Sequence, residues 1–135
     1  KLLESDDYLE GFHFVDGSFV ENIEVLANRP PKDIDLFSVL RKPQKYTNDQ
    51  SLWKTCGIDF WRGEVANRDK NKARFSLDTY AILYEEHGPL DFVTHVLYWY
   101  GLFSHQRVTF AWKGIVAIKL DPVDDQAARN LLEQG

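Results

Sequence analysis

The chain has 135 residues, of which 44% are apolar and 14% aromatic, and it carries a net charge of −5. That length predicts one domain (residues 1–135) with a core of its own, and the composition excludes a disordered chain. The apolar runs are too short to cross a membrane, and the acidic balance argues against bulk binding of DNA. A single cysteine, Cys56, excludes an internal disulfide and favours a reducing, cytoplasmic location. Because the chain begins with Lys1 and contains no methionine, we expect it to be a fragment of a longer product with an upstream segment.

A short apolar segment between glycines, residues 11–15, predicts the first strand. After Gly17, the sequence Ser-Phe-Val-Glu fits a capping box, in which the Ser18 hydroxyl accepts from the Glu21 amide and the Glu21 carboxylate from the Ser18 amide. We therefore expect a helix from Ser18 to about residue 27, where two prolines follow.

The remaining elements are predicted from periodicity and turn residues. Strands are expected where polar and apolar residues alternate, and helices where apolar residues recur every three or four positions. These criteria predict strands over 33–40, 74–84 and 115–120, and helices over 52–56, 60–65, 90–104 and 124–133. The polar residues 41–50 indicate a loop, and the basic run 68–74 indicates a solvated turn or, less often, a track for RNA. This mixture predicts an α/β or α+β domain in which helices flank a short mixed sheet.

Aspartates inside apolar strands are the strongest sign of a functional site. Asp33 and Asp35 stand two apart, so their side chains would share one face of a strand with Cα atoms about 6.6 Å apart. Asp78 interrupts another apolar strand, where an isolated carboxylate is costly unless it is paired, hydrogen-bonded or bound to a metal. Carboxylate oxygens are the ligands that Mg²⁺ prefers. Together the three aspartates predict a metal site, although an exposed edge strand or a structural hydrogen-bond hub would explain each alone.

Other residues could contact phosphate. Gly17 and Ser18 stand where a strand leads into a helix, a junction that offers free backbone amides to an anion, or forms an ordinary helix cap. Arg107 and Lys113 follow the helix predicted over 90–104 and could bind a phosphate, while the aromatic residues of that helix fall at the spacing of a core face.

His95 has no partner histidine at metal-binding spacing, so no histidine site is expected.

The segments VDGSF, KDIDLF and SLDTY resemble the pattern of the DNA polymerase β-type nucleotidyltransferase superfamily. The stretches VDGSFVENIE, RPPKDIDL, YWYGLFSHQR and WKGIVAIKL are similar to a group of small prokaryotic nucleotidyltransferase-like proteins, and the likeness covers most of residues 12–120. Fourteen residues separate Ser18 from Asp33, slightly more than the usual gap. The phosphate and metal sites therefore stay in register only if a longer helix or a turn, such as the elbow at residues 29–31, absorbs the excess.

The resemblance implies a minimal nucleotidyltransferase fold and a Mg²⁺-dependent transfer of a nucleotidyl group from a nucleoside triphosphate to a protein, RNA or small-molecule hydroxyl, with release of pyrophosphate. Two Mg²⁺ ions, replaceable by Mn²⁺, would be held by Asp33, Asp35 and Asp78, and Gly17 and Ser18 would bind the phosphates. Relatives of this kind serve as toxins, antitoxins or antiviral-defence components. Two alternatives stay open: a non-catalytic, antitoxin-like module that binds nucleotide or a partner, and a metal-dependent phosphoesterase.

Overall fold

Four strands form one mixed sheet in the computed structural model of the chain, which describes residues 1–106 and 109–134. Their spatial order is β3-β2-β1-β4, with bounds β1 (Gly11–Asp16), β2 (Ile34–Leu40), β3 (Leu77–Leu83) and β4 (Val116–Leu120). The central strand β1 is antiparallel to both of its neighbours, and β2 is parallel to β3. The predicted mixture of helices and a short mixed sheet is therefore confirmed, and the class is α+β.

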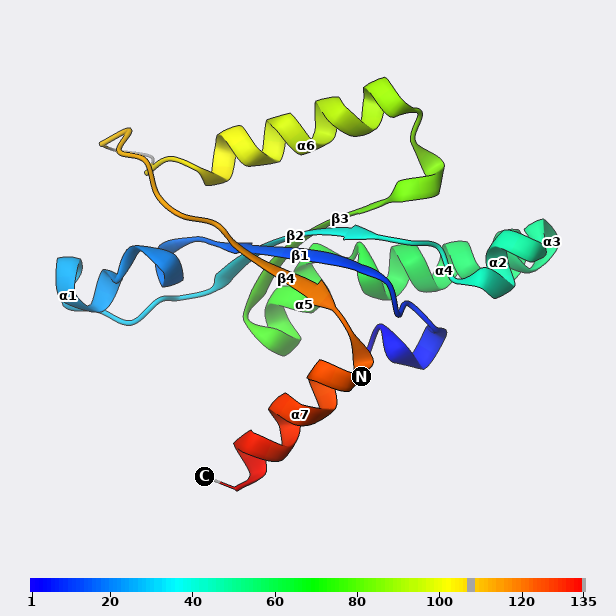
Figure 1. The fold of residues 1–135 in the computed structure, drawn as a ribbon, viewed down its shortest axis with the longest axis horizontal. Helices are drawn as coiled ribbons and strands as arrows, with labels where there is room; N and C mark the ends of the chain where they lie inside the picture. The colour runs from blue at the N-terminus through cyan, green and yellow to red at the C-terminus, as the bar shows by residue number, and fades with distance from the viewer. Residues whose placement is uncertain (107–108, 135) are drawn as a thin grey trace.

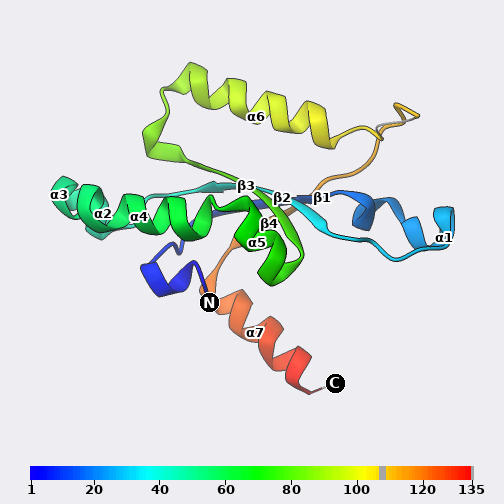
Figure 2. The same cartoon turned by 180° about the vertical axis from the view of Figure 1, so that it is seen from behind.

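Helices lie on both faces of the sheet (Figures 1 and 2). The short helices and turns are η1 (Glu4–Asp6), η2 (Ser18–Glu21), α1 (Ile23–Ala27), α2 (Gln44–Asn48), α3 (Gln50–Leu52), η3 (Trp53–Gly57), α4 (Ile58–Phe60), η4 (Trp61–Val65) and η5 (Tyr84–Glu86). The longer helices are α5 (Arg68–Phe75), α6 (Pro89–Phe103) and α7 (Pro122–Glu133). Helix α6 covers one face, whereas α4, α5 and the N-terminal segment cover the other, and α7 projects away from the sheet. The described residues contain no helix that combines the length and the apolar character a membrane span requires.

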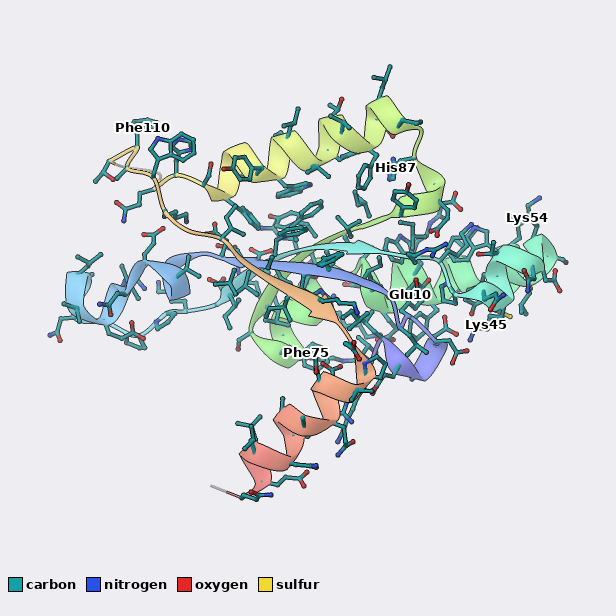
Figure 3. The ribbon with its side chains drawn as sticks, viewed as in Figure 1. Glu10, Lys45, Lys54, Phe75, His87 and Phe110 are labelled. Carbon is teal, nitrogen blue, oxygen red and sulfur yellow. The ribbon has the colours of Figure 1, made fainter. Side chains whose placement is uncertain are left out.

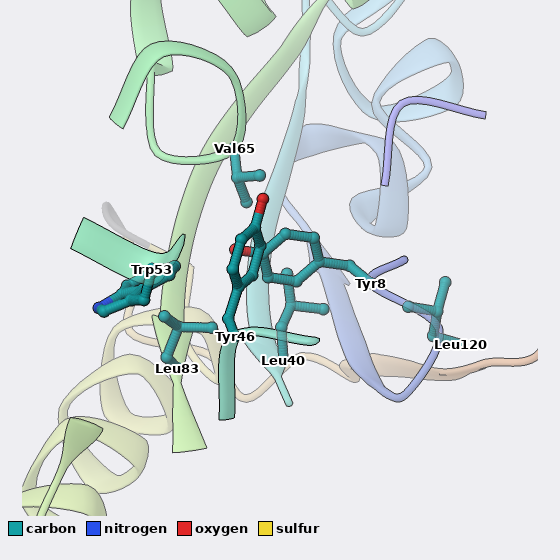
Figure 4. Close-up of a cluster of buried hydrophobic side chains, with 7 residues drawn as sticks. All are labelled: Tyr8, Leu40, Tyr46, Trp53, Val65, Leu83 and Leu120. Atoms are coloured by element: carbon teal, nitrogen blue, oxygen red, sulfur yellow. The ribbon is translucent and has the colours of Figure 1, made fainter. Parts of the chain in front are cut away.

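Alternation along the strands gives each face its own hydrophobic core. Under the N-terminal segment and the helices of residues 44–75, seven buried side chains cluster (Figure 4): Tyr8, Leu40, Tyr46, Trp53, Val65, Leu83 and Leu120. Under α6, the buried residues are Phe37, Ile82 and Phe103, and Phe37 stacks on Trp99 with ring centroids 5.3 Å apart. The prediction that aromatic residues of this helix form a core is thus confirmed for Trp99 and Phe103.

Several boundaries differ from the sequence predictions. Residues 44–48, expected as a loop, form α2, and residues 50–65 are helical throughout, with two π-helical segments, η3 and η4. The basic run expected as a turn is helix α5, which Asn67 caps by accepting a hydrogen bond from the Lys70 amide. Strand β3 therefore begins at Leu77, after Ser76 adopts a left-handed conformation with φ 56°.

The capping box predicted at Ser18 is not formed. Ser18 begins the 3-10 helix η2, Gly17 is its N-cap, and no side chain caps it. The Glu21 carboxylate instead accepts a hydrogen bond from Lys113 at 2.7 Å. Because Asn22 adopts a left-handed conformation, the helix expected up to residue 27 is divided into η2 and α1.

Candidate functional site

Three aspartates stand side by side across β1, β2 and β3. Asp16 is the register partner of Asp35 in the antiparallel pair, and Asp35 is the register partner of Asp78 in the parallel pair. Side chains two residues apart on a strand share a face, so these carboxylates point to the face that α6 covers. The next row on that face is aromatic: Phe14, Phe37 and Tyr80. The sheet thus carries a polar row at the edge of an apolar core.

This polar row opens into a pocket of about 440 Å³. Six residues predicted for the site line the pocket: Gly17, Ser18, Asp33, Asp35, Asp78 and Lys113. Asp33 itself lies one residue before β2, so the strand expected from residue 33 begins at Ile34. Helix α1 and the following turn take up the long spacing between Ser18 and Asp33, since both residues reach the same pocket. The remaining predicted residue, Arg107, lies outside the described residues.

Two cations from α5 pair with the acids of the pocket. Nη2 of Arg68 donates to Oδ2 of Asp78 at 2.7 Å, and Nε of Arg68 donates to Oδ1, so the contact is bidentate. One turn later, Nζ of Lys72 lies 2.6 Å from Oδ2 of Asp33 and 3.4 Å from Oδ2 of Asp78. The hydrogen bond from Arg68, opposed by burial, lowers the pKa of Asp78 below its ordinary value. Asp78 is therefore ionised at neutral pH.

A third cation, Lys113, pairs with the acids at the β1 end of the row. Its ammonium lies 3.0 Å from Oδ2 of Asp16 and 2.7 Å from Oε1 of Glu21. Asp16 is 3% exposed, and burial raises its pKa despite the contact with Lys113. Lys113, predicted as a phosphate ligand, therefore lies at the pocket with its charge directed at two carboxylates.

Gly17 is required by the close approach of the backbone to Asp35. Its φ is +89°, a conformation that side chains rarely adopt. A Cβ at this position would lie 2.6 Å from Oδ2 of Asp35 and 3.2 Å from the backbone nitrogen of Asp35. The glycine predicted as a phosphate contact thus has a second role, because it leaves room for the central carboxylate of the row.

The sequence reasoning did not identify Asp16, Arg68 and Lys72 as site residues. Asp16 adjoins a glycine turn, where an acidic residue is common, and the basic run looked like a solvated turn. The available signal was the spacing of Arg68 and Lys72, four residues apart, which places both on one helix face ahead of the strand that holds Asp78.

The donor atoms of this pocket match the preference of Mg²⁺ for oxygen ligands. Oδ1 of Asp16 is buried and has no hydrogen-bond partner among residues 1–106 and 109–134. Arg68 and Lys72 now pair with Asp33 and Asp78, and both cations are about half exposed, at 52% and 50%. The acids therefore fit Mg²⁺ by their chemistry. A metal there would require Lys72 to leave Asp33 and the bidentate contact of Arg68 with Asp78 to open.

A histidine pair, which the sequence analysis did not expect, lies elsewhere on the molecule. In the described part of the chain, His87, Asp91 and His95 form the only group of three potential metal ligands whose atoms lie within 4.8 Å of one another. The prediction that His95 has no partner is wrong, because α6 places His95 one turn after Asp91, and the turn before the helix returns His87 to the same side.

Comparison with curated proteins gives no match, and comparison with solved structures gives none either. The sequence model of one family, described as a family of unknown function, matches residues 3–119. The matched region contains all four strands of the sheet except the last residue of β4, and every described residue that lines the pocket. The chain therefore belongs to DUF6932, a family of unknown function.

Proposed function

We propose that the chain is a nucleotidyltransferase that moves a nucleotidyl group from a nucleoside triphosphate to a hydroxyl and depends on Mg²⁺. The observation that supports this proposal is that Asp33, Asp35 and Asp78 line one pocket, which Gly17 and Ser18 also line. The order of the parts along the chain also agrees with a minimal nucleotidyltransferase fold: a strand with Gly-Ser, a helix, a strand with Asp-x-Asp, and a later strand with one more acid.

In the proposed site, the three aspartates would hold the metal. Mg²⁺ bound there would neutralise the pyrophosphate leaving group and lower the pKa of the attacking hydroxyl. Asp78 is better suited to a ligand than to a general base, because the hydrogen bond from Arg68 lowers its pKa. Ser18 and the backbone at Gly17 would orient the phosphates, and Arg68 and Lys72 would balance the negative charge of the nucleotide.

The cations of α5 favour a second candidate function, a module that binds nucleotide without turning it over. Arg68 and Lys72 neutralise Asp78 and Asp33. A chain that kept these pairs when nucleotide binds would leave Asp33 and Asp78 unavailable to Mg²⁺, and Gly17 and Ser18 would then contact the triphosphate without the metal. Such a module would bind nucleotide and release no pyrophosphate.

The experiment that distinguishes these functions follows the α-phosphate of the nucleoside triphosphate. The protein is incubated with each nucleoside triphosphate labelled on the α-phosphate, with Mg²⁺ and with a cell extract that supplies acceptors, and label transfer and pyrophosphate are measured. We expect both products with the wild type, and a fall to the protein-free background for the double variant Asp33→Asn/Asp35→Asn, which keeps the size of the side chains but removes two ligand charges.

The matched control is Asp59→Asn, which removes one negative charge from an exposed position on α4, outside the pocket. This variant should transfer label as the wild type does. Transfer that persists in Asp33→Asn/Asp35→Asn would exclude these acids from the chemistry. Tight nucleotide binding without pyrophosphate would favour the binding module, and hydrolysis of a phosphodiester without nucleotide would indicate a phosphoesterase.

A further inference from the structure

We infer that His87, Asp91 and His95 form a binding site for one divalent transition-metal ion of the zinc class, separate from the aspartate pocket. The three residues span the start of α6: His87 follows η5 and precedes the Gly-Pro turn, Asp91 lies in the first turn of the helix, and His95 lies one turn later. Figure 3 shows His87 at this junction, beside the first turns of α6. This end of α6 is opposite the end that approaches the aspartate pocket through Leu102 and Phe103.

The geometry brings three ligand atoms to one point. Nδ1 of His87 lies 2.5 Å from Oδ2 of Asp91, and Nε2 of His95 lies 3.6 Å from Oδ1 of the same carboxylate. The two imidazole rings are 4.8 Å apart between centroids and inclined at 64°, and the three potential ligand atoms lie within 4.8 Å of one another. Ligand atoms around one zinc ion are about 3.3 Å apart, given bonds of about 2.0 Å in a tetrahedron. Small side-chain rotations would therefore close the site.

The ligand types select the metal. Two imidazole nitrogens and one carboxylate oxygen suit Zn²⁺, Ni²⁺ or Cu²⁺, whereas Mg²⁺ prefers oxygen ligands alone. Asp91 is 58% exposed at its side chain and His95 40%, so an ion can reach them from solvent, while His87 is more enclosed at 21%. Three protein ligands leave one tetrahedral position for water or an external ligand.

An ion-pair explanation accounts for only part of this arrangement. Asp91 in the first turn of α6 complements the helix dipole, and its contact with His87 would be favourable without a metal. That explanation covers the contact of each ring with Asp91, but it does not account for the two imidazoles lying 4.8 Å apart between centroids. The nearby acid Glu86 is already bound to Lys42, so it does not compete for the two rings. A metal uses all three side chains at once and would link η5 to the first turns of α6.

Zinc binding is tested by calorimetric titration of protein without a histidine tag. We expect the wild type to bind one Zn²⁺ per chain. The zinc affinity should be weaker by about tenfold or more in His87→Ala, Asp91→Asn and His95→Ala, because removing a residue that only orients a metal ligand already lowers metal affinity by about tenfold. Mg²⁺ should not compete. The matched controls are His105→Gln, which removes a histidine after the other end of α6, and Asp33→Asn/Asp35→Asn, which disables the aspartate pocket. Both should bind zinc as the wild type does.

Two measurements on the wild type keep the inference falsifiable if a variant fails to fold. Zinc should raise the melting temperature, because it binds the native state, and it should shift the ring ¹⁵N resonances of His87 and His95 but not those of His13. Three results would each overturn the site. They are the absence of zinc binding by the wild type, zinc binding by the folded variants His87→Ala and His95→Ala that is as tight as that of the wild type, and a loss of zinc binding that occurs only in Asp33→Asn/Asp35→Asn.

Discussion

Asp16 and Asp78 are almost equally buried, 3% and 5% exposed, yet their pKa values move in opposite directions. Asp78 receives two hydrogen bonds from the planar guanidinium of Arg68, which favours its charged form and outweighs burial. Asp16 shares the single ammonium of Lys113 with Glu21, so burial dominates. The protonation of these two acids therefore depends on the cation that donates to each of them more than on how deeply each is buried.

His13 carries the clearest pH dependence outside the pocket. Its Nδ1 lies 2.8 Å from Oγ of Ser38, and burial lowers its pKa below 6.5, partly offset by Asp125. The native state thus favours the neutral ring, so this contribution to stability is present above pH 6.5 and is lost as the pH falls through the lowered native pKa. Between about pH 7 and pH 5, the wild type should lose more unfolding free energy than His13→Gln, which stays neutral.

Urea unfolding of both proteins across this range measures the difference. Gln can keep a hydrogen bond to Ser38 and has no charge to bury, so it is the appropriate comparison. Parallel pH profiles for the two proteins, or a His13 ring that titrates at or above its ordinary pKa in NMR, would contradict the prediction.

At the scale of elements, periodic apolar patterns predicted most of the framework. Strands β1, β2 and β4 and helices α6 and α7 lie within one or two residues of their expected bounds. The failures have local causes. Helix α5 has basic and polar residues at most positions, so its sequence shows no apolar periodicity. The capping box at Ser18 does not form because the Glu21 carboxylate pairs with Lys113 instead. That ion pair joins residues far apart in sequence, which a local motif cannot anticipate.

The attachment of α6 to the sheet depends on Phe37. This side chain is 2% exposed and stacks on Phe14 and Trp99, so it connects the strand face to the helix. Phe37→Ala should lower the unfolding free energy by about 3–5 kcal/mol, which is the usual cost of removing a buried ring. Domains typically have about 5–15 kcal/mol in total, so this variant should lose a substantial fraction of its unfolding free energy.

The control is Phe110→Ala, which removes the same ring where it is 77% exposed and should change stability by less than about 0.5 kcal/mol. Denaturant unfolding followed by tryptophan fluorescence measures both. Equal destabilisation by the two variants would show that the ring at position 37 does not anchor the helix.

The pocket is a property of the whole molecule. Asp35 and Asp78 could be predicted from the sequence because each interrupts an apolar strand, where a carboxylate is costly without a partner, and Asp33 because it directly precedes such a strand two residues from Asp35. Asp16, Arg68 and Lys72 could not, since their local sequence is that of ordinary polar turns and only the register of β1 with β2 and of α5 with β3 brings them together. The sequence thus contains the unusual residues of the site, and the sheet topology supplies their partners.

Helix α7 is the part of the molecule least connected to that framework. It has no buried residue, and its apolar side chains are largely exposed, with Val123 at 77% and Leu132 at 82%. It projects away from the sheet, and the family match ends before it begins (Figure 1). The described contact that holds its second half is an ion pair between Arg129 and Glu4, 2.9 Å long. We therefore infer that the core folds without it.

A chain ending at Asp121 should keep the circular dichroism of the sheet and unfold cooperatively, with a melting temperature within about 4 °C of the full chain, because little apolar surface is lost from the core. It should also keep the zinc and nucleotide binding of the full chain, since none of the proposed ligands lies on α7. The matched control is Arg129→Ala, which breaks the ion pair but keeps the helix. If truncation abolished cooperative unfolding while Arg129→Ala did not, the apolar side of α7 would have to pack on the domain in solution.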